Sequence, residues 1–305
     1  MADLLLPCRL STDYSLDSMS RVQSVVSVLT SIHKSISKGS AKKFSPYEGL
    51  AALRSMTRIS RLYSLNYMGE YTMMLKVDEN ADYGTATILH EYLVGIVVNS
   101  LRDTIANFIY TYGYVDDVHI YRSRNSAYCL RRDNGQYALI QQYIQRSVPM
   151  TELEIGTAAF SVIRNSYSIV DEQPVLCEGV NVLRLILIQL LSALAYSYYI
   201  LGFVHRDLNP SNVLIVQLPT IMAVPLMIPT MKDDTVHFEL QYMITNALVV
   251  VVDLEVSTVR ADVLSKYGYP YQYLISTESA FVIHEKMTAF ENDIVRFLTT
   301  IKGTV

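Results

Sequence analysis

The sequence predicts an α+β fold with two parts: a small β-rich N-terminal part that holds one long helix, and a shortened, helical C-terminal part. Strand-like runs rich in Tyr and Ile lie before residue 146, and an apolar stretch at residues 181–204 has helical spacing. The hydrophobic pattern changes at residues 142–148, with no flexible linker to mark the change. We therefore predict one part at residues 1–143, including an N-terminal extension, and the other at residues 144–305.

The composition describes a folded chain without a strong charge bias. Half of the 305 residues are hydrophobic and 18% are charged, which excludes a wholly disordered chain. The net charge of −4 gives no basic field, so we expect no nucleic-acid partner. The three cysteines form no C-x-x-C pair and the six histidines are scattered. This pattern argues against a disulfide framework or a structural zinc site and favours a reducing, cytoplasmic compartment.

The N-terminal part is predicted to contain both helices and strands. Apolar residues recur at helical spacing in some stretches, whereas other stretches alternate or are rich in Tyr and Ile. We predict helices at 20–37, 48–66 and 86–105, and strands at 70–79, 107–122 and 136–145. Residues 122–136 carry turn signals, so we expect them to connect the last two strands.

The C-terminal part is predicted to begin with a long helix and to continue as a hairpin. Residues 185–204 carry no charge and are long enough to span a bilayer. Because Gln189, Ser192 and Ser197 lie inside this stretch, we interpret it as a buried helix and expect no membrane span. Residues 213–230 contain three prolines, so we predict a strand followed by an irregular insertion there.

The stretch "GFVHRDLNPSNVLI", residues 202–215, lies between two apolar runs. Transfer of a γ-phosphoryl group requires a carboxylate that orients the attacking hydroxyl and oxygen ligands that hold Mg²⁺. Asp207 and, five positions later, Asn212 offer these groups in one loop. Asp253 follows a run of four valines, where a buried strand could present a carboxylate to a metal.

Phosphoryl transfer also needs a cation that positions the nucleotide phosphates. Lys76 lies in a predicted strand, fifteen residues before Glu91 in a predicted helix. The two side chains could pair, and the pair would aim the ammonium group at the phosphates.

The order Lys, Glu, H-R-D, Asn and Asp resembles that of the eukaryotic-type protein kinases, in a divergent form such as large DNA viruses encode. The resemblance covers about residues 36–298 and is most specific at residues 189–216. It implies a bilobal, protein-kinase-like fold that uses ATP and Mg²⁺ to phosphorylate Ser/Thr hydroxyls of a protein substrate. It also implies a location in the host-cell cytoplasm or the virion.

The resemblance implies a role for each residue of the main motifs. Asp207 would be the catalytic base, and Asn212 and Asp253 would hold Mg²⁺. Lys76 would anchor the nucleotide phosphates, and Glu91 would be its partner.

Further residues of the catalytic loop and a later helix also match the family. His205 and Arg206 belong to the H-R-D motif, and Arg206 would pair with an ordered activation segment. Asp293, in "ENDIVRFL", resembles the buried aspartate that ties the catalytic loop to a later helix.

Two stretches resemble the family's adenine and phosphate contacts. Gln142 and Tyr143 lie in "ALIQQYIQ", which would be the hinge that receives adenine. Gly39 and Ser40 lie in "ISKGSAKKF". This stretch resembles a glycine-rich loop, of whose glycines only Gly39 is kept. Backbone N–H groups there would approach a phosphate.

Departures from the family pattern leave two other functions open. Asn209 stands where Ser/Thr kinases usually have a lysine, Asp-Leu-Glu stands for D-F-G, and only fifty-two residues follow Asp253. One alternative is a small-molecule kinase of the choline or aminoglycoside type, in which Asp-aromatic-Glu is common. The other is a pseudokinase that acts as a regulatory binding module. The presence of Lys, Glu, both Asp residues and Asn together favours an active kinase.

Overall fold

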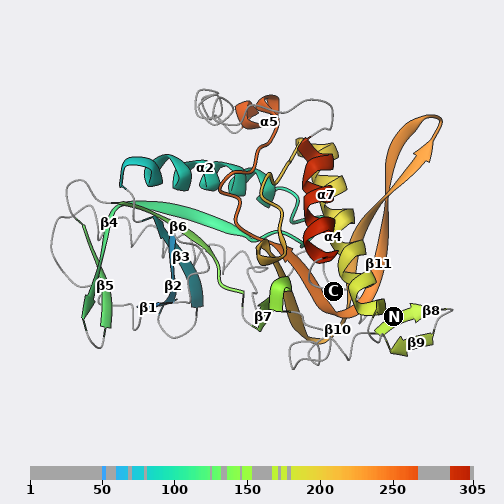
Figure 1. Cartoon of the computed structure of the whole chain (residues 1–305), viewed down its shortest axis with the longest axis horizontal. Helices are drawn as coiled ribbons and strands as arrows, with labels where there is room; N and C mark the ends of the chain where they lie inside the picture. Colours follow the sequence, from blue (N-terminus) through green and yellow to red (C-terminus); the bar gives the residue numbers. More distant parts are fainter. Residues whose placement is uncertain are drawn as a thin grey trace. The chain divides into compact units, whose positions relative to one another are not determined.

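The computed structural model (Figure 1) describes the residues of the following ranges: 50–52, 60–67, 71–78, 81–123, 126–131, 136–144, 146–152, 167–170, 173–176, 180–266 and 289–302. These residues group into two compact units. The sheet unit comprises the described residues within 50–96 and 110–143, and the hairpin unit comprises those within 97–109 and 144–302. The predicted helix at residues 20–37 lies outside the described residues.

The sheet unit is a closed antiparallel sheet in the order β1-β2-β3-β6-β4-β5. Its strands are β1 Leu50–Ala52, β2 Ser60–Tyr67, β3 Tyr71–Asp78, β4 Thr111–Ser123, β5 Ser126–Arg131 and β6 Gln136–Gln142. The predicted helix at residues 48–66 is therefore wrong, because β1 and most of β2 occupy it. The predicted turn region at residues 122–136 also holds a strand, β5, which closes the sheet against β1.

Helix α2, Ala81–Asn99, follows β3 and begins earlier than the predicted helix at residues 86–105. Ile88, Glu91 and Val94 are buried at a spacing of three residues, which forms one inward-facing stripe. Gly95 continues this stripe at the point where α2 meets β4. A Cβ atom at Gly95 would lie 2.2 Å from the hydroxyl oxygen of Thr111, so only glycine permits this close approach.

The hairpin unit combines helices with a long antiparallel hairpin, whose strands pair in the order β11-β10-β7. Its elements are β7 Ser147–Pro149, η2 Met150–Glu152, β8 Tyr167–Val170, β9 Gln173–Leu176, α4 Val180–Leu201, η3 Pro210–Asn212, β10 Val213–Lys232, β11 Thr235–Val251, α5 Ala261–Lys266 and α7 Ala289–Lys302. The prediction of a helical C-terminal part is thus right for α4 and α7 but omits the extent of the hairpin.

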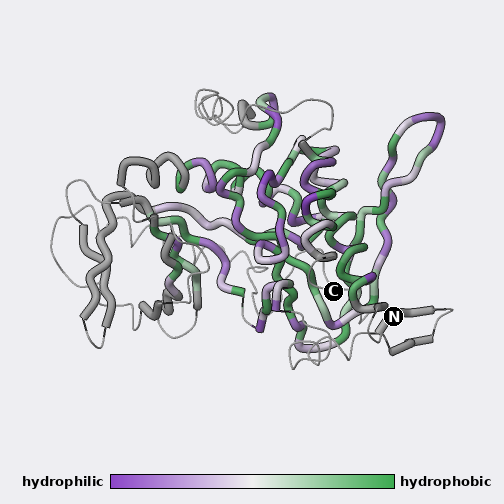
Figure 2. Tube along the Cα trace, viewed as in Figure 1, coloured by the Kyte–Doolittle hydropathy of each residue, from purple (hydrophilic) through white to green (hydrophobic). Residues whose placement is uncertain are grey.

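Strand β10 is continuous, so the predicted irregular insertion at residues 213–230 is wrong. The irregularity is confined to a register shift between Gln217 and Met222. Pairing with β7 covers only Leu214 to Val216, so the remainder of β10 borders only β11 among the described strands, and an edge strand tolerates prolines. Asp233 and Asp234 have φ angles of 50° and 58°, which allows a two-residue type I′ turn. The hairpin is hydrophobic near its base and hydrophilic at its tip (Figure 2).

Helix α4 packs against the hairpin through a stripe that contains polar as well as apolar side chains. The amide of Gln189 donates to the carbonyl of Ala247 (3.0 Å) and accepts from the N–H of Val249 (3.0 Å). Ser192 donates to the carbonyl of Met227 (2.9 Å). The helix ends at Leu201, and the next residue, Gly202, has a φ of 63°, which favours glycine.

The segment Leu183–Leu201 of α4 is the one helix among the described residues that is long and apolar enough to cross a membrane. Of this segment, 39% is buried inside the structure. A core helix of a protein outside the membrane can be equally long and apolar. The absence of a membrane span therefore stays a prediction.

Replacing Gln189 by Leu should lower the free energy of unfolding by about 2–4 kcal/mol, because it leaves two buried backbone groups of β11 without their partner. Gln189 is 0% exposed, so water cannot substitute for its amide. Urea denaturation of the full chain measures the change. Ser192 is 5% exposed and makes one such hydrogen bond. Ser192→Ala should therefore lower the free energy of unfolding by about 1 kcal/mol. Equal losses in the two variants would contradict the role of Gln189.

Candidate active site

The loop that follows α4 is fixed to the residues just after β11. His205 is 0% exposed, and its Nε2 lies 3.0 Å from the carbonyl oxygen of Val252. The N–H of Val252 donates to the carbonyl of Asn212 (3.0 Å), and the hydroxyl of Ser257 donates to the carbonyl of His205 (3.1 Å). These contacts hold the loop against the segment that carries Asp253. The buried His205 therefore helps to fix the backbone of the loop to this segment.

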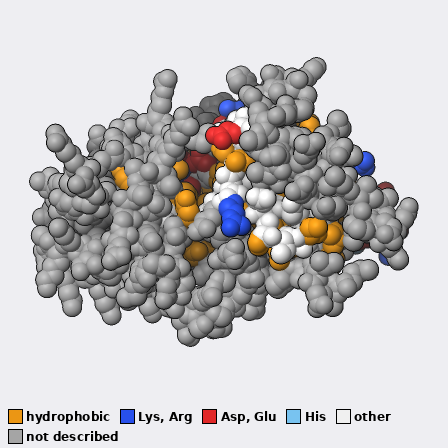
Figure 3. Space-filling model, turned by 90° about the horizontal axis from the view of Figure 1, so that it is seen from below, with side chains coloured by type: hydrophobic (Ala, Val, Ile, Leu, Met, Phe, Trp, Pro, Cys, Tyr) orange, Lys and Arg blue, Asp and Glu red, His pale blue; other side chains and the backbone are white. Residues whose placement is uncertain are grey.

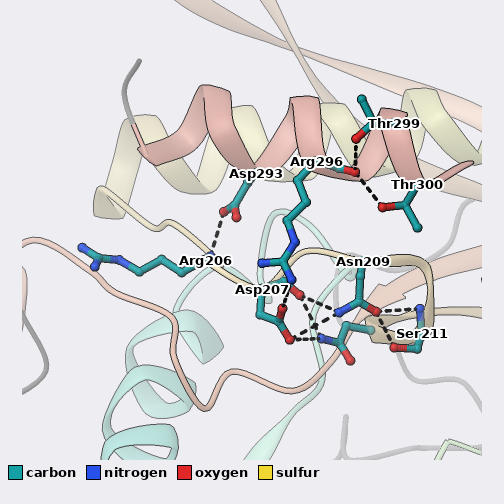
Figure 4. Close-up of polar contacts among 9 residues, drawn as sticks. Arg206, Asp207, Asn209, Ser211, Asp293, Arg296, Thr299 and Thr300 are labelled. Carbon is teal, nitrogen blue, oxygen red and sulfur yellow. Dashed lines mark hydrogen bonds and ion pairs between the residues drawn. The ribbon is translucent and has the colours of Figure 1, made fainter. Parts of the chain in front are cut away.

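Asp207 presents a partly exposed carboxylate surrounded by amide donors. The Nδ2 of Asn212 donates to the backbone carbonyl of Asp207 (2.9 Å) and to its Oδ2 (3.3 Å). The Nδ2 of Asn209 makes the same two contacts at 3.1 and 3.3 Å. The guanidinium of Arg296, on α7, lies 3.0 Å from the Oδ1 of Asp207. Figure 4 shows Arg296 pointing toward Asp207, whereas the side chain of Arg206 extends away from it.

Asn209 folds back into the loop. It is the N-cap of η3, and its Oδ1 accepts hydrogen bonds from both the N–H (2.9 Å) and the hydroxyl of Ser211. Both ends of this amide are thus used within the loop.

Two residues of the site have an uncommon backbone conformation. Arg206 and Asp253 both have a φ of 63°, which costs of order 1–3 kcal/mol for a residue other than glycine and is typical of functional sites. The Nε of Arg206 donates to the hydroxyl of Thr258 (3.1 Å). Val204 and Thr258 also exchange two backbone hydrogen bonds. Arg206 therefore contacts the segment that follows Asp253, and its pairing with an ordered activation segment stays a prediction.

Asn212 and Asp253 carry oxygen atoms of the kind that a hard cation binds. Because the Nδ2 of Asn212 faces Asp207, its Oδ1 remains without a hydrogen-bond donor among the described residues. The bond from Val252 to Asn212 brings the next residue, the half-buried Asp253, to the same end of the loop. An amide oxygen and a carboxylate are the donors that Mg²⁺ prefers.

Asp293 of α7 ties the loop down from the other side. Its Oδ2 accepts the backbone N–H of Arg206 at 2.8 Å, and the residue is 5% exposed. Burial raises the pKa of the Asp293 carboxyl, while the backbone donors of the loop and the His205 imidazole act in the opposite direction. The sequence-based expectation for Asp293 agrees with this geometry.

The raised pKa of Asp293 predicts a pH dependence of stability. The folded chain binds the proton of the Asp293 carboxyl more strongly than the unfolded chain does. This difference stabilises the folded chain below the ordinary aspartate pKa of about 3.9, and the stabilisation is lost as the pH rises through the raised pKa. The free energy of unfolding of wild type should therefore fall relative to Asp293→Asn over this range. Urea denaturation across the range measures the difference. Asp234→Asn, at the exposed hairpin tip, is the control, and parallel pH profiles of wild type and Asp293→Asn would contradict the prediction.

The sheet unit contains the predicted pair of a strand lysine and a helix glutamate. The Nζ of Lys76, on β3, lies 2.7 Å from the Oε2 of Glu91, on α2. Gln141, on β6, donates to the Oε1 of Glu91 (3.2 Å) and to the hydroxyl of Thr111 (3.5 Å). Lys76, Glu91 and Gln141 are 4%, 0% and 1% exposed. The structure thus places a buried, hydrogen-bonded cation on β3.

The other predicted nucleotide contacts are less defined by the structure. Gln142 is buried and its N–H donates to the carbonyl of Tyr110 (2.8 Å), while Tyr143 is half-buried. Their role in adenine binding stays a prediction. Gly39 and Ser40 lie outside the described residues.

Two residues of the site were missed by the sequence analysis. Arg296 lies three positions after Asp293, on the same side of α7, and this spacing could have indicated it. Gln141 lies inside the predicted hinge stretch, where a buried amide gives no distinct sequence signal.

The face seen in Figure 3 carries both acidic and basic side chains of described residues. The expectation of no nucleic-acid partner stays a prediction.

Comparisons with known proteins give likenesses among solved structures. No family model matches the sequence, and no curated protein matches it. Among solved structures, the chain is similar to the kinase domain of PF14_0431, with 14% sequence identity, coverage of 74% of this chain and 55% of that chain, and a TM-score of 0.35. The chain thus spans about half the length of the chain it matches. A likeness at this level does not define the fold or the function.

Proposed function

We propose that the protein is an ATP- and Mg²⁺-dependent protein kinase that phosphorylates Ser/Thr hydroxyls. The observation that carries the proposal is the set of hydrogen bonds that joins Asp207, Asn212 and Val252, because it brings a partly exposed carboxylate, an amide side chain and the residue before Asp253 together. The buried Lys76–Glu91 pair also supports it, because the proposed reaction needs a cation that a carboxylate orients toward the nucleotide phosphates.

In the proposed reaction, the carboxylate of Asp207 orients the acceptor hydroxyl and takes its proton. The bond between the γ-phosphorus and the bridging oxygen of ADP breaks as the bond to the acceptor oxygen forms, and ADP leaves with the electron pair. Asn212 and Asp253 would hold Mg²⁺, which supplies positive charge to the phosphate oxygens when bound. Lys76 would hold the phosphates of the nucleotide, and Glu91 would orient Lys76.

A transfer assay with radiolabelled ATP and Mg²⁺ on the purified chain tests the proposal. The acceptors are casein, a basic protein and choline, and phosphoamino acid analysis identifies the modified residue. We expect phosphoserine or phosphothreonine, loss of signal with EDTA, and loss in Lys76→Met but not in the matched control Lys232→Met at the exposed hairpin tip. Transfer to choline alone would overturn the protein-kinase assignment in favour of a small-molecule kinase.

A nucleotide-binding module without transfer is the second candidate. The ion pair between Arg296 and Asp207 favours it, because the carboxylate that would accept a proton already has a cationic partner. Nucleotide binding by wild type, with no transfer to any acceptor and no difference between wild type and Asp207→Asn, would establish this alternative.

A further inference from the structure

The catalytic loop has no cation of its own beside the proposed base. The transferring phosphoryl group carries charge on its oxygen atoms that a nearby cation stabilises in the transition state. Asn209 is the neutral residue two positions after Asp207, and its amide is used within the loop by Ser211 and Asp207. The side chain of Arg206 is bonded to Thr258 and extends away from Asp207 (Figure 4).

The guanidinium group of Arg296 lies beside Asp207, where the loop itself offers no cation. Its Nη2 lies 3.0 Å from the Oδ1 of Asp207, on the side of the carboxylate opposite to the Oδ2 that faces the two amides. The side chain of Arg296 is 57% exposed and that of Asp207 is 39% exposed. Ion pairs with this much solvent contact are weak, so the guanidinium can exchange the carboxylate for the oxygen atoms of a phosphate.

The helix that carries Arg296 is fixed to the same loop. Asp293 accepts the N–H of Arg206 one helical turn before Arg296, and Phe297, the next residue, is 0% exposed. In addition, Phe290 stacks on Tyr198 of α4 with ring centroids 4.7 Å apart. These contacts hold the Arg296 backbone at a set distance from Asp207, which leaves only the exposed side chain to move.

We infer that Arg296 supplies the cation that stabilises the transferring phosphoryl group, in place of a cationic side chain at position 209. The inference rests on the proposed function, since it needs a phosphoryl group to be transferred beside Asp207. Arginine suits this role because its planar fork can bind two phosphate oxygens and its charge is permanent.

The test compares full-length wild type with Arg296→Ala, Arg296→Lys and the double variant Asn209→Lys/Arg296→Ala. We expect Arg296→Ala to lower kcat about 10²-fold, with the KM for ATP nearly unchanged. Arg296→Lys should keep most of the rate, and a lysine introduced at position 209 should restore part of it. Arg260→Ala is the matched control, because Arg260 is a similarly exposed arginine (51%) paired with Asp262.

A second readout does not depend on turnover. The complex of ADP, Mg²⁺ and fluoroaluminate mimics the transferring group, and its binding is measured by the rise in Tm. We expect Arg296→Ala to reduce the rise caused by fluoroaluminate while leaving the rise caused by ADP and Mg²⁺ alone unchanged.

The outcomes separate the inference from the proposed function. If kcat and the fluoroaluminate response of Arg296→Ala equal those of wild type, or if its kcat exceeds that of wild type, the inference is overturned, and a higher kcat would show that Arg296 blocks Asp207. If wild type and Asp207→Asn are equally inactive toward every acceptor, the proposed function fails.

Discussion

Replacing Glu91 by Gln is expected to lower the free energy of unfolding by about 3–5 kcal/mol, because it removes the carboxylate that lies 2.7 Å from a buried ammonium group. Lys76 and Glu91 are 4% and 0% exposed, so water cannot take over the role of the carboxylate. The isosteric amide also disturbs Gln141, which donates to the Oε1 of Glu91. Urea denaturation followed by circular dichroism measures the loss.

Two further variants show whether the loss of stability in Glu91→Gln comes from the broken ion pair. Glu239→Gln, on the exposed part of β11, should change stability by no more than about 0.5 kcal/mol. The double variant Lys76→Met/Glu91→Leu replaces the pair with apolar side chains and should recover much of the loss, because apolar replacements of a buried ion pair are often neutral. A single variant as stable as wild type would show that the pair is not buried in solution.

Replacing Asp207 by Asn is expected to lower kcat by about 10²–10⁴-fold, the usual contribution of a positioned general base. The amide matches the carboxylate in size but cannot take the proton of the acceptor hydroxyl. The backbone carbonyl of Asp207 still accepts from Asn209 and Asn212, so the loop should keep its shape. Single-turnover transfer of labelled phosphate measures the rate.

The affinity for ADP should be nearly the same in wild type and Asp207→Asn, because the base acts on the acceptor. Asp234→Asn, at the exposed turn of the hairpin, is the matched control and should transfer at the wild-type rate. A rate of Asp207→Asn equal to that of wild type would remove Asp207 from the role of base.

The parts of the site that lie close together in the sequence could be predicted from it. Asp207 and Asn212 are five residues apart in one loop, so their spacing already implies contact, and the structure contains it. The pair of Lys76 and Glu91 joins a strand to the helix that follows it, which local patterns also indicate. The anchor Asp293 was indicated by resemblance rather than by spacing.

The parts that depend on distant pairing could not be predicted. The strands β1 and β5 are short, and their pairing with each other depends on closure of the whole sheet, which local periodicity does not contain. The prolines of β10 indicated irregular structure, but the edge position that tolerates them follows only from how little of β10 is paired with β7. Arg296 meets Asp207 only because α7 folds back onto the loop.

The contact between Asp293 and Arg206 spans 87 residues of chain, and this has a consequence for synthesis. Ribosomes add about 5–20 residues per second, so about 4–17 seconds separate translation of the loop from translation of its anchor. During that interval the nascent loop has the H-R-D sequence but lacks both the carboxylate that fixes Arg206 and the guanidinium beside Asp207. The loop therefore reaches its final form only after α7 has left the ribosome.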